Sequence, residues 1–192
     1  MNIYVKSGEA TTATTDVLVC LEYEQEKTWS KAIRPVDQKL SGQLSDLRKS
    51  GEFSGKPNNT ALLHINGKLP TKRVLLVGLG SRETVTLERI RQAMGTAAKR
   101  ARSVKAKGIV CVVPDVPKAT GHPTAVAQAM VEGVILGDYR FNEYRTDRSD
   151  DSHTLQSCTV LATSSSSLDE IKEGTNRGHI LGEATCFVRD LC

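Results

Sequence analysis

The chain has 192 residues, of which 39% are hydrophobic and 25% are charged, and its formal net charge is +4. These proportions are typical of a globular domain with its own core, and no apolar run approaches the roughly 20 residues that a membrane-spanning helix needs. The first twelve residues, MNIYVKSGEATT, contain no apolar signal-peptide core. The sequence therefore argues against an integral membrane protein and against secretion, and favours the cytoplasm.

Five cysteines are present, and no two of them form a CxxC pair. Cys20, Cys111 and Cys158 fall inside apolar, strand-like runs, where a thiol usually acts as a small hydrophobic group. We therefore expect a reducing cytosol, with neither a disulfide framework nor a zinc knuckle.

The first third of the chain predicts two strands and one helix. Met1–Lys6 and Asp16–Glu22 are short, apolar and rich in β-branched residues, as strands are. The stretch Trp29–Arg48 has apolar residues at helical spacing, with Pro35 suited to its first turn. The apolar positions are Val36, Leu40, Leu44 and Leu47.

A pair of strands and a second helix are expected next. Thr60–Ile65 and Arg73–Gly80 are apolar runs on either side of an Asn-Gly turn at residues 66 and 67. The helix is predicted from Leu87 to Val104, with Thr86 as its N-cap.

The rest of the chain predicts two further strands, each followed by a helix. The run 108–114 is apolar throughout, as in a strand covered on both faces, and a helix begins near Pro123. A strand is expected over 157–163, and Ser167 and Glu170 form the pattern of a capping box at the start of the last helix.

Strands and helices thus alternate after an opening pair of strands. This order predicts a three-layer α/β/α sandwich around one mixed, mostly parallel sheet. We assign residues 1–166 to an N-terminal α/β domain and residues 167–192 to a C-terminal helix.

Charge is distributed unevenly along the chain. Residues 51–107 hold twelve basic and three acidic side chains, a balance of +9, whereas residues 108–192 hold seven basic and twelve acidic ones, a balance of −5. A basic helix over 89–107 could neutralise phosphates, but its charges spread around the exposed half and no aromatic residues lie between them to stack on bases. A solvated face is the favoured interpretation, and nucleic-acid binding is the alternative. The candidate residues are Arg89, Arg91, Lys99, Arg100, Arg102, Lys105 and Lys107.

VGLGS, at Val77–Ser81, follows a strand and precedes a helix, which is where a phosphate-binding loop belongs. A dinucleotide fingerprint needs a third glycine at position 83, and Glu83 occupies it. We therefore interpret the glycines as serving a tight turn.

The four histidines form no recognised metal-binding motif. The nearest to one is His153 with Asp150 and Asp151 on a polar connector, where a solvated loop is the favoured interpretation. No nucleophile elbow and no catalytic carboxylate pair occurs. From the residues alone we assign no catalytic, cofactor-binding or metal-binding side chain.

Gly174, Gly178 and Gly182 recur every four residues in the last helix, although each costs about 1 kcal/mol in helix propensity against alanine. Small residues at this spacing allow another backbone to approach closely. We expect packing within the chain, with a partner surface as the alternative.

Four segments, taken in order, resemble the cytosolic leucyl aminopeptidase family. FSGK at Phe53–Lys56 is similar to the family's F-x-G-K loop, and RVLLVGLG with Thr86–Arg102 is similar to its strand, glycine turn and alanine-rich helix. VEGVILGDYRFNEY at Val131–Tyr144 resembles its E-G-x-x-L-x-x-Y-x-F-x-x-Y segment, and Glu183–Cys192 resembles the A-R-D-L junction before the next domain.

The resemblance implies an N-terminal domain with a macrodomain-like fold, followed by a larger catalytic domain. In the family that second domain carries two divalent metals (Mn or Zn), a lysine, an arginine and the motifs N-T-D-A-E-G-R and D-S-G-G, neither of which occurs in these 192 residues. The metals would activate a water and polarise the carbonyl of a peptide's first residue. The resemblance also implies a hexamer as homo-oligomer, and DNA binding in some bacterial members.

Three functions follow as hypotheses. The first is a non-catalytic N-terminal domain of a leucyl aminopeptidase, inactive alone, with a role in assembly or regulation and with its own catalytic domain as partner. The second is a nucleic-acid-binding module that uses the basic residues 89–107. The third is a macrodomain-like binder of ADP-ribose or a related nucleotide, for which VGLGS is the supporting motif.

Overall fold

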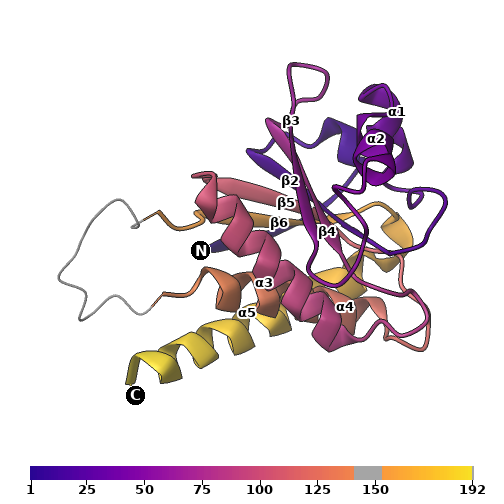
Figure 1. The fold of residues 1–192 in the computed structure, drawn as a ribbon. Coiled ribbons are helices and arrows are strands. Elements are labelled where there is room, and N and C mark those ends of the chain that lie inside the picture. The colour runs from indigo at the N-terminus through magenta and orange to yellow at the C-terminus, as the bar shows by residue number, and fades with distance from the viewer. Residues whose placement is uncertain (141–152, 192) are drawn as a thin grey trace.

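A six-stranded sheet forms the middle of the protein, as the computed structural model shows (Figure 1). The structure describes residues 1–140 and 153–191. The strand order is β1-β6-β5-β2-β4-β3, and every neighbouring pair is parallel except β3 and β4. The strands are β1 (Asn2–Ser7), β2 (Val17–Glu22), β3 (Thr60–His64), β4 (Arg73–Gly78), β5 (Gly108–Val112) and β6 (Ser157–Ala162).

Helices cover both faces of this sheet, so the predicted three-layer α/β sandwich with a mostly parallel sheet is confirmed. On one face lie α1 (Arg34–Lys39) and α2 (Gln43–Lys49), and on the other lie α3 (Leu87–Ser103), α4 (Pro123–Asp138) and α5 (Leu168–Leu191). The helix α4 packs between α3 and α5. Alternate residues of the central strands point to opposite faces, so Val19 and Leu75 pack under α3 and α4 while Leu18 and Leu76 pack under α1 and α2.

The segment predicted as one helix over 29–48 is two short helices, so that prediction was wrong. Ser41 and Gly42, between α1 and α2, have φ values of 58° and 83°. A right-handed helix cannot continue through two left-handed residues, and the chain turns there. Leu40 and Leu44 are nevertheless both buried, since the turn returns the second helix to the same face of the sheet.

The helix α3 begins and ends at recognisable caps. Thr86 accepts a hydrogen bond from the backbone N–H of Arg89 at 3.2 Å, which confirms it as the N-cap. At the other end Lys105 has a φ of 54°, and the N–H of Ala106 bonds to the carbonyl of Ala101 at 3.1 Å. This is the pattern of a Schellman ending. Lys105 and Lys107 therefore lie beyond the helix, in the turn to β5.

The last helix starts differently from the prediction. A 3-10 turn, Ser165–Ser167, precedes Leu168, and the side chain that caps this turn is that of Ser164, which accepts from the N–H of Ser166. Ser167, expected as the N-cap, is instead the end of that turn. The run of four serines gives the chain several hydroxyls that can serve as a cap, and the sequence pattern does not distinguish among them.

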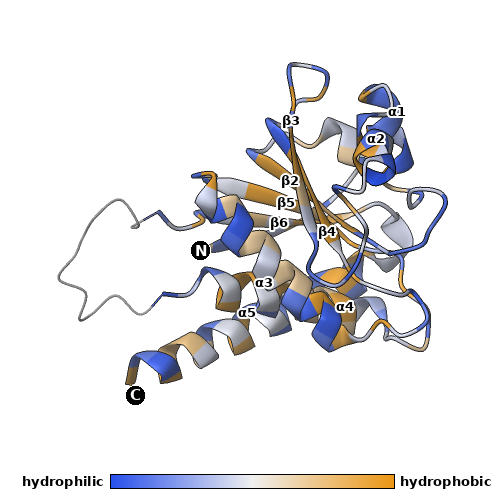
Figure 2. Ribbon diagram, viewed as in Figure 1, coloured by the Kyte–Doolittle hydropathy of each residue, from blue (hydrophilic) through white to orange (hydrophobic). Residues whose placement is uncertain are grey.

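Apolar residues follow the architecture closely: the strands and the sheet-facing sides of the helices are hydrophobic, and the outer sides of α1, α2 and α3 are mostly polar (Figure 2). Cys20, Cys111 and Cys158 are free and fully buried among them, as small hydrophobic residues. Over the described residues, none of the helices is both long and apolar enough to cross a membrane.

Candidate functional site

The seven basic residues singled out in the sequence lie in three places. Arg89 and Arg91 are on the first turns of α3, whereas Lys99, Arg100 and Arg102 are on its last turns. Lys105 and Lys107 follow in the turn to β5. The set is therefore not one helical stripe, because the left-handed ending at Lys105 redirects the chain.

Two of these arginines connect α3 to α4 and are committed to carboxylates. The Nη2 atom of Arg91 lies 2.7 Å from Oε2 of the buried Glu132, and Arg91 also pairs with Glu88. The Nη1 atom of Arg102 donates to the main-chain oxygen of Asp138 at 2.9 Å and lies 3.4 Å from its carboxylate. Both arginines therefore act as interhelix links, and a nucleic-acid backbone would have to compete with these bonds.

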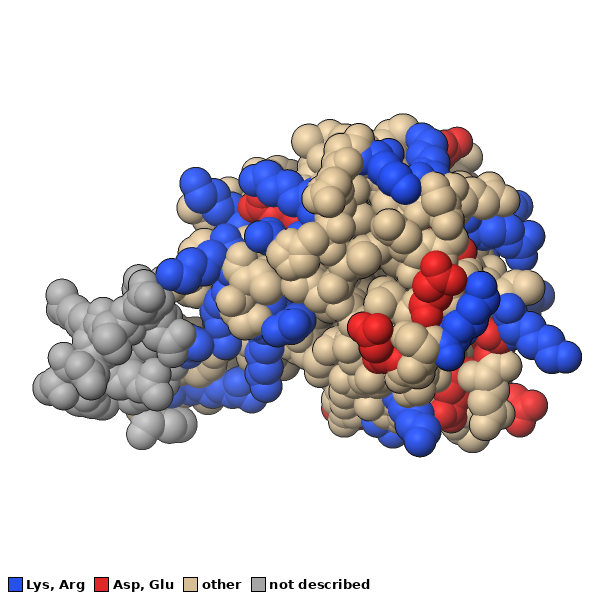
Figure 3. All heavy atoms as spheres, turned by 45° about the horizontal axis from the view of Figure 1, so that its top comes forward, with Lys and Arg blue, Asp and Glu red and all other residues tan. Residues whose placement is uncertain are grey.

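The other basic side chains are at the surface. Arg89 bonds to Gln92 and Arg100 to Ser103, both within the helix. Figure 3 shows lysine and arginine side chains gathered at the end of the molecule where α3 ends, whereas basic and acidic side chains mix at the opposite end. Nucleic-acid binding by this set stays a prediction.

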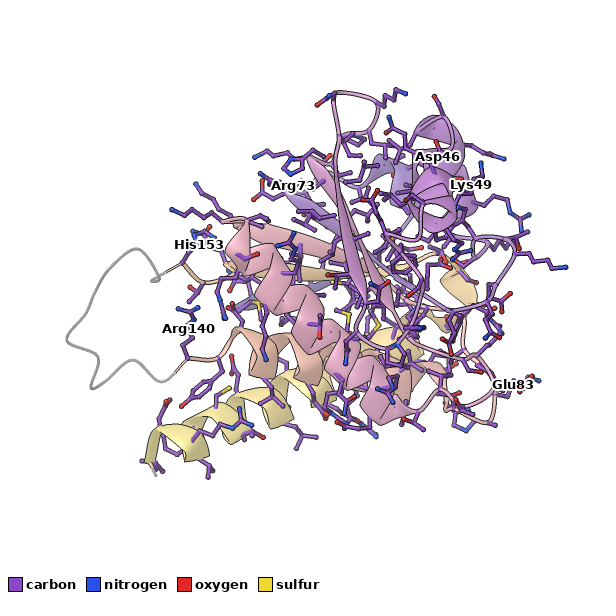
Figure 4. All side chains as sticks on the ribbon, viewed as in Figure 1. Asp46, Lys49, Arg73, Glu83, Arg140 and His153 are labelled. Carbon is purple, nitrogen blue, oxygen red and sulfur yellow. The ribbon has the colours of Figure 1, made fainter. Side chains whose placement is uncertain are left out.

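The VGLGS loop is a packing motif. The N–H of Gly80 bonds to the carbonyl of Gly55 at 2.9 Å, and a Cβ on Gly78 would overlap the carbonyl of Lys56. Gly55 itself has a φ of 75° and lies against the backbone of Tyr23. The glycines of FSGK and VGLGS thus let two loops meet backbone to backbone, which confirms the tight-turn interpretation. Glu83 points outward from the next loop (Figure 4).

Histidines and acidic residues do not gather into a metal centre in the described part of the chain: no group of three His, Cys, Asp or Glu side chains there could hold an ion. His153 contacts the carbonyl of Ala106 through Nε2 at 2.7 Å, beyond the end of α3 (Figure 4). Its two sequence neighbours in the proposed cluster, Asp150 and Asp151, lie outside the described residues.

One face of α5 packs on α4 through its glycines. A Cβ on Gly178 would lie 2.6 Å from the carbonyl oxygen of Gln128, and one on Gly182 would lie 2.9 Å from Cδ1 of Ile135. A Cβ on Gly174 would overlap the carbonyl of Thr124. The predicted packing within the chain is confirmed, because at each glycine α4 approaches so closely that a larger residue would displace it.

The opposite face of α5 is apolar and exposed over its second half. Phe187 lies nine residues after Gly178, which at about 100° per residue is half a turn away. The exposed fractions lie between 49% and 70% for five large hydrophobic side chains at the spacing of one helix face. They are Ile180, Leu181, Phe187, Val188 and Leu191, and we call them the α5 apolar face. A contiguous patch of exposed apolar side chains usually marks an interaction surface, whereas single exposed hydrophobic residues are common on any protein.

Polar contacts hold the last turns of α5 to the end of α4. The hydroxyl of Tyr139 donates to Oδ1 of Asp190 at 2.7 Å, and the guanidinium of Arg189 lies over the Tyr139 ring at 5.6 Å from its centroid. The hydrogen bond to Asp190 raises the pKa of Tyr139 to about 12. Tyr139 therefore keeps its proton at neutral pH and remains a donor.

Comparisons with known proteins match this chain over most of its length. The model of the "Cytosol aminopeptidase family, N-terminal domain" matches residues 17–148. A "Probable cytosol aminopeptidase" of Roseiflexus castenholzii is 34% identical over 192 residues, which cover 100% of this chain and 36% of that protein. A protein of the same description from Alkaliphilus metalliredigens is 30% identical over 179 residues, covering 92% of this chain and 35% of the relative.

Solved structures agree on the fold. A tomato leucine aminopeptidase mutant superimposes with a TM-score of 0.72 at 24% identity, covering 97% of this chain and 36% of the other. The bottromycin maturation enzyme BotP superimposes with a TM-score of 0.63 at 21% identity, over 92% of this chain and 32% of BotP.

The chain thus spans about a third of the length of the curated relatives and solved structures that it matches. The matched family model covers more than half of the chain, from β2 into the residues after α4. The FSGK and VGLGS loops, two of the motifs that suggested the resemblance, contact each other in the structure. The chain belongs to the cytosol aminopeptidase family and corresponds to its N-terminal domain.

Proposed function

We propose that this chain is a non-catalytic domain of an aminopeptidase and that the α5 apolar face packs against the catalytic domain. The single observation that carries the second part is the exposure of five large hydrophobic side chains on a helix whose glycine face packs on α4 as far as Gly182. Burying them would remove from water an apolar area that this domain leaves exposed.

In this proposal the hydrolysis of a peptide's first bond belongs to the catalytic domain. Two divalent ions, Mn or Zn, would supply the activated water and polarise the carbonyl there. The described residues of this chain do not fit such a centre, because they hold no cluster of suitable ligands. The contribution of this chain is to position and support, and an assembly role in a hexamer is part of the proposal.

The cytosol is the compartment that we propose. Three fully buried free thiols are compatible with it, because they pack as hydrophobic residues and need no oxidising environment.

The inactivity of the chain alone is tested by incubating it with leucine p-nitroanilide and manganese. We expect no release of nitroaniline above the buffer control, since no group of three side chains that could hold a metal ion occurs among the described residues. Steady turnover that survives repurification and is abolished by a chelator would contradict the proposal.

Docking is tested with the catalytic part of the Roseiflexus castenholzii relative, expressed together with this chain. We expect the two to copurify, and Phe187→Asp to weaken association at least tenfold, because a carboxylate would be placed in an apolar contact. Asn176→Asp, at an exposed position on the first half of α5, is the matched control and should change nothing. Equal association of both variants would exclude the α5 apolar face as the interface, and dimers of the chain alone would assign that face to a second copy.

A further inference from the structure

The parallel strands all end at the same edge of the sheet. At that edge the connections that follow β2 and β5 run to opposite faces of the sheet. After β2 the chain passes to α1 and α2 on one face, whereas after β5 it passes to α4 on the other. The two strands are neighbours. A parallel sheet has a crevice where adjacent connections diverge in this way, and ligands of open α/β sheets bind at that point.

Two cavities lie at this edge. One, of about 580 Å³, lies beyond the ends of β5 and β6 and beside the first turns of α4 and α5. The second, of about 320 Å³, lies beyond the ends of β2 and β5. They share the lining residues Val113, Pro114, Asp115 and Thr163, and we call the two together the crevice. Its size is that of a small-molecule site.

The walls of the crevice are apolar and its rim is basic. Val113, Val116, Val126 and Ile171 form much of the larger cavity. Lys118 and His122 line the same cavity, and Lys31 lines the smaller one. The hydroxyl residues Thr163, Ser164 and Ser167 and the acidic Asp115 complete the polar lining of the larger cavity.

Two acidic groups at the crevice, Asp115 and Glu22, already have partners. The carboxylate of Asp115 pairs with Arg82 at 2.8 Å, and Arg82 lies over the ring of Tyr23. Glu22 is 1% exposed and accepts a 2.6 Å bond from the hydroxyl of Ser30, which lines the smaller cavity. Burial raises the pKa of Glu22, which favours its neutral form. The ion pair with Arg82 offsets the charge of Asp115, so its repulsion of an anion bound in the crevice is reduced.

We propose that the crevice binds a small organic anion with an apolar or aromatic body, such as a nucleoside monophosphate. The apolar walls would take the body, and Lys118, His122 and the hydroxyls would take the charged group. This site differs from the one that VGLGS suggested, since Gly78 and Gly80 pack against the FSGK loop.

The site is independent of the proposed docking of a catalytic domain. Ser167, just before α5, and Ile171, near its start, line the crevice, whereas the α5 apolar face occupies the second half of the helix, at its other end (Figure 1). Binding can therefore be tested on this chain alone, and its failure would leave the docking proposal standing.

The test is calorimetric titration of the chain with AMP, with adenosine and inorganic phosphate as separate probes for the body and the charge. We expect one AMP per chain, bound at least tenfold more tightly than either part. Thr163→Trp should reduce AMP affinity at least tenfold, since Thr163 lines both cavities and an indole there would occupy the space where they meet. Ser103→Trp, at the end of α3 on the opposite edge of the sheet, is the matched control.

Lys118→Ala, compared with Lys49→Ala on α2, provides a second readout that does not depend on filling the cavity. Lys118 and Lys49 are both exposed, so neither substitution should unfold the chain. We expect AMP affinity to fall at least threefold in the first variant only. Absence of binding by all three probes at millimolar concentration would overturn the proposal, as would AMP binding that both Lys118→Ala and a folded Thr163→Trp leave unchanged.

Discussion

Arg102 on α3 donates a hydrogen bond to the main-chain oxygen of Asp138, the last residue of α4, at 2.9 Å. The Asp138 carboxylate lies 3.4 Å from the same nitrogen and accepts from the N–H of Leu155 at 3.0 Å. Side chains of the pair are 13% and 10% exposed. One buried carboxylate therefore joins two helices and the segment that leads into β6.

We expect Asp138→Ala to lower the free energy of unfolding by about 3 kcal/mol, since it leaves the buried N–H of Leu155 without its acceptor and removes the carboxylate beside the buried Arg102 guanidinium. Urea denaturation followed by circular dichroism measures this. Asp46→Ala is the control, because Asp46 and Lys49 are 68% and 77% exposed (Figure 4) and such pairs contribute at most about 1 kcal/mol. A loss below about 1 kcal/mol for Asp138→Ala would show that the link is not structural.

Gly178→Ala should destabilise the protein although alanine is the better helix former. The gain in propensity is about 1 kcal/mol, but the new Cβ would lie 2.6 Å from the carbonyl oxygen of Gln128, and a backbone atom cannot rotate away. We expect a net loss of about 2 kcal/mol, in the range of overpacked cores.

The neighbouring substitution Asn176→Ala gives the matched comparison for that experiment. Asn176 is exposed on the same helix, so alanine there should raise the free energy of unfolding by a few tenths of a kcal/mol. If both substitutions stabilise the protein, the close approach of α4 and α5 is not as tight as described.

Glu22→Gln should change the pH dependence of stability. Burial raises the pKa of Glu22 in the folded protein. The protonated carboxyl therefore contributes its full stability below the unfolded pKa of about 4.3. This contribution to the free energy of unfolding is lost as the pH rises through the folded pKa. The stability of the variant relative to the natural protein should therefore increase between these two values, by at most about 1.4 kcal/mol per pH unit. Thermal unfolding at pH 4, 6 and 8 measures it, and a difference that is constant with pH would contradict the assignment.

Local patterns predicted most of the elements. The apolar runs of β2, β4 and β5 and the cap at Thr86 follow from residue type and spacing, because each depends on neighbours in the chain. The break between α1 and α2 was not predicted, because the apolar positions keep helical spacing across it. A serine also gives no indication that its φ will be left-handed, as that of Ser41 is. Gly42, next to it, was the available signal.

Features that depend on distant parts of the chain were harder to predict. Arg91 and Arg102 were grouped with surface cations because their acidic partners, Glu132 and Asp138, are 41 and 36 residues away. The crevice combines loops after three strands, and no single motif marks it. By contrast, the repeat of glycines in α5 predicted close packing within the chain. Three small residues at one spacing on a helix indicate that another segment lies close to that face, and this segment is α4.

The glycine contacts also determine how α5 can meet a partner. Backbone-to-backbone packing on α4 fixes the axis and the rotation of the helix before any encounter, and the bond between Tyr139 and Asp190 holds its final turns. A binding surface that is already ordered loses little conformational entropy on association. Recognition at this helix would therefore resemble the joining of two rigid bodies more than the coupled folding of a tail.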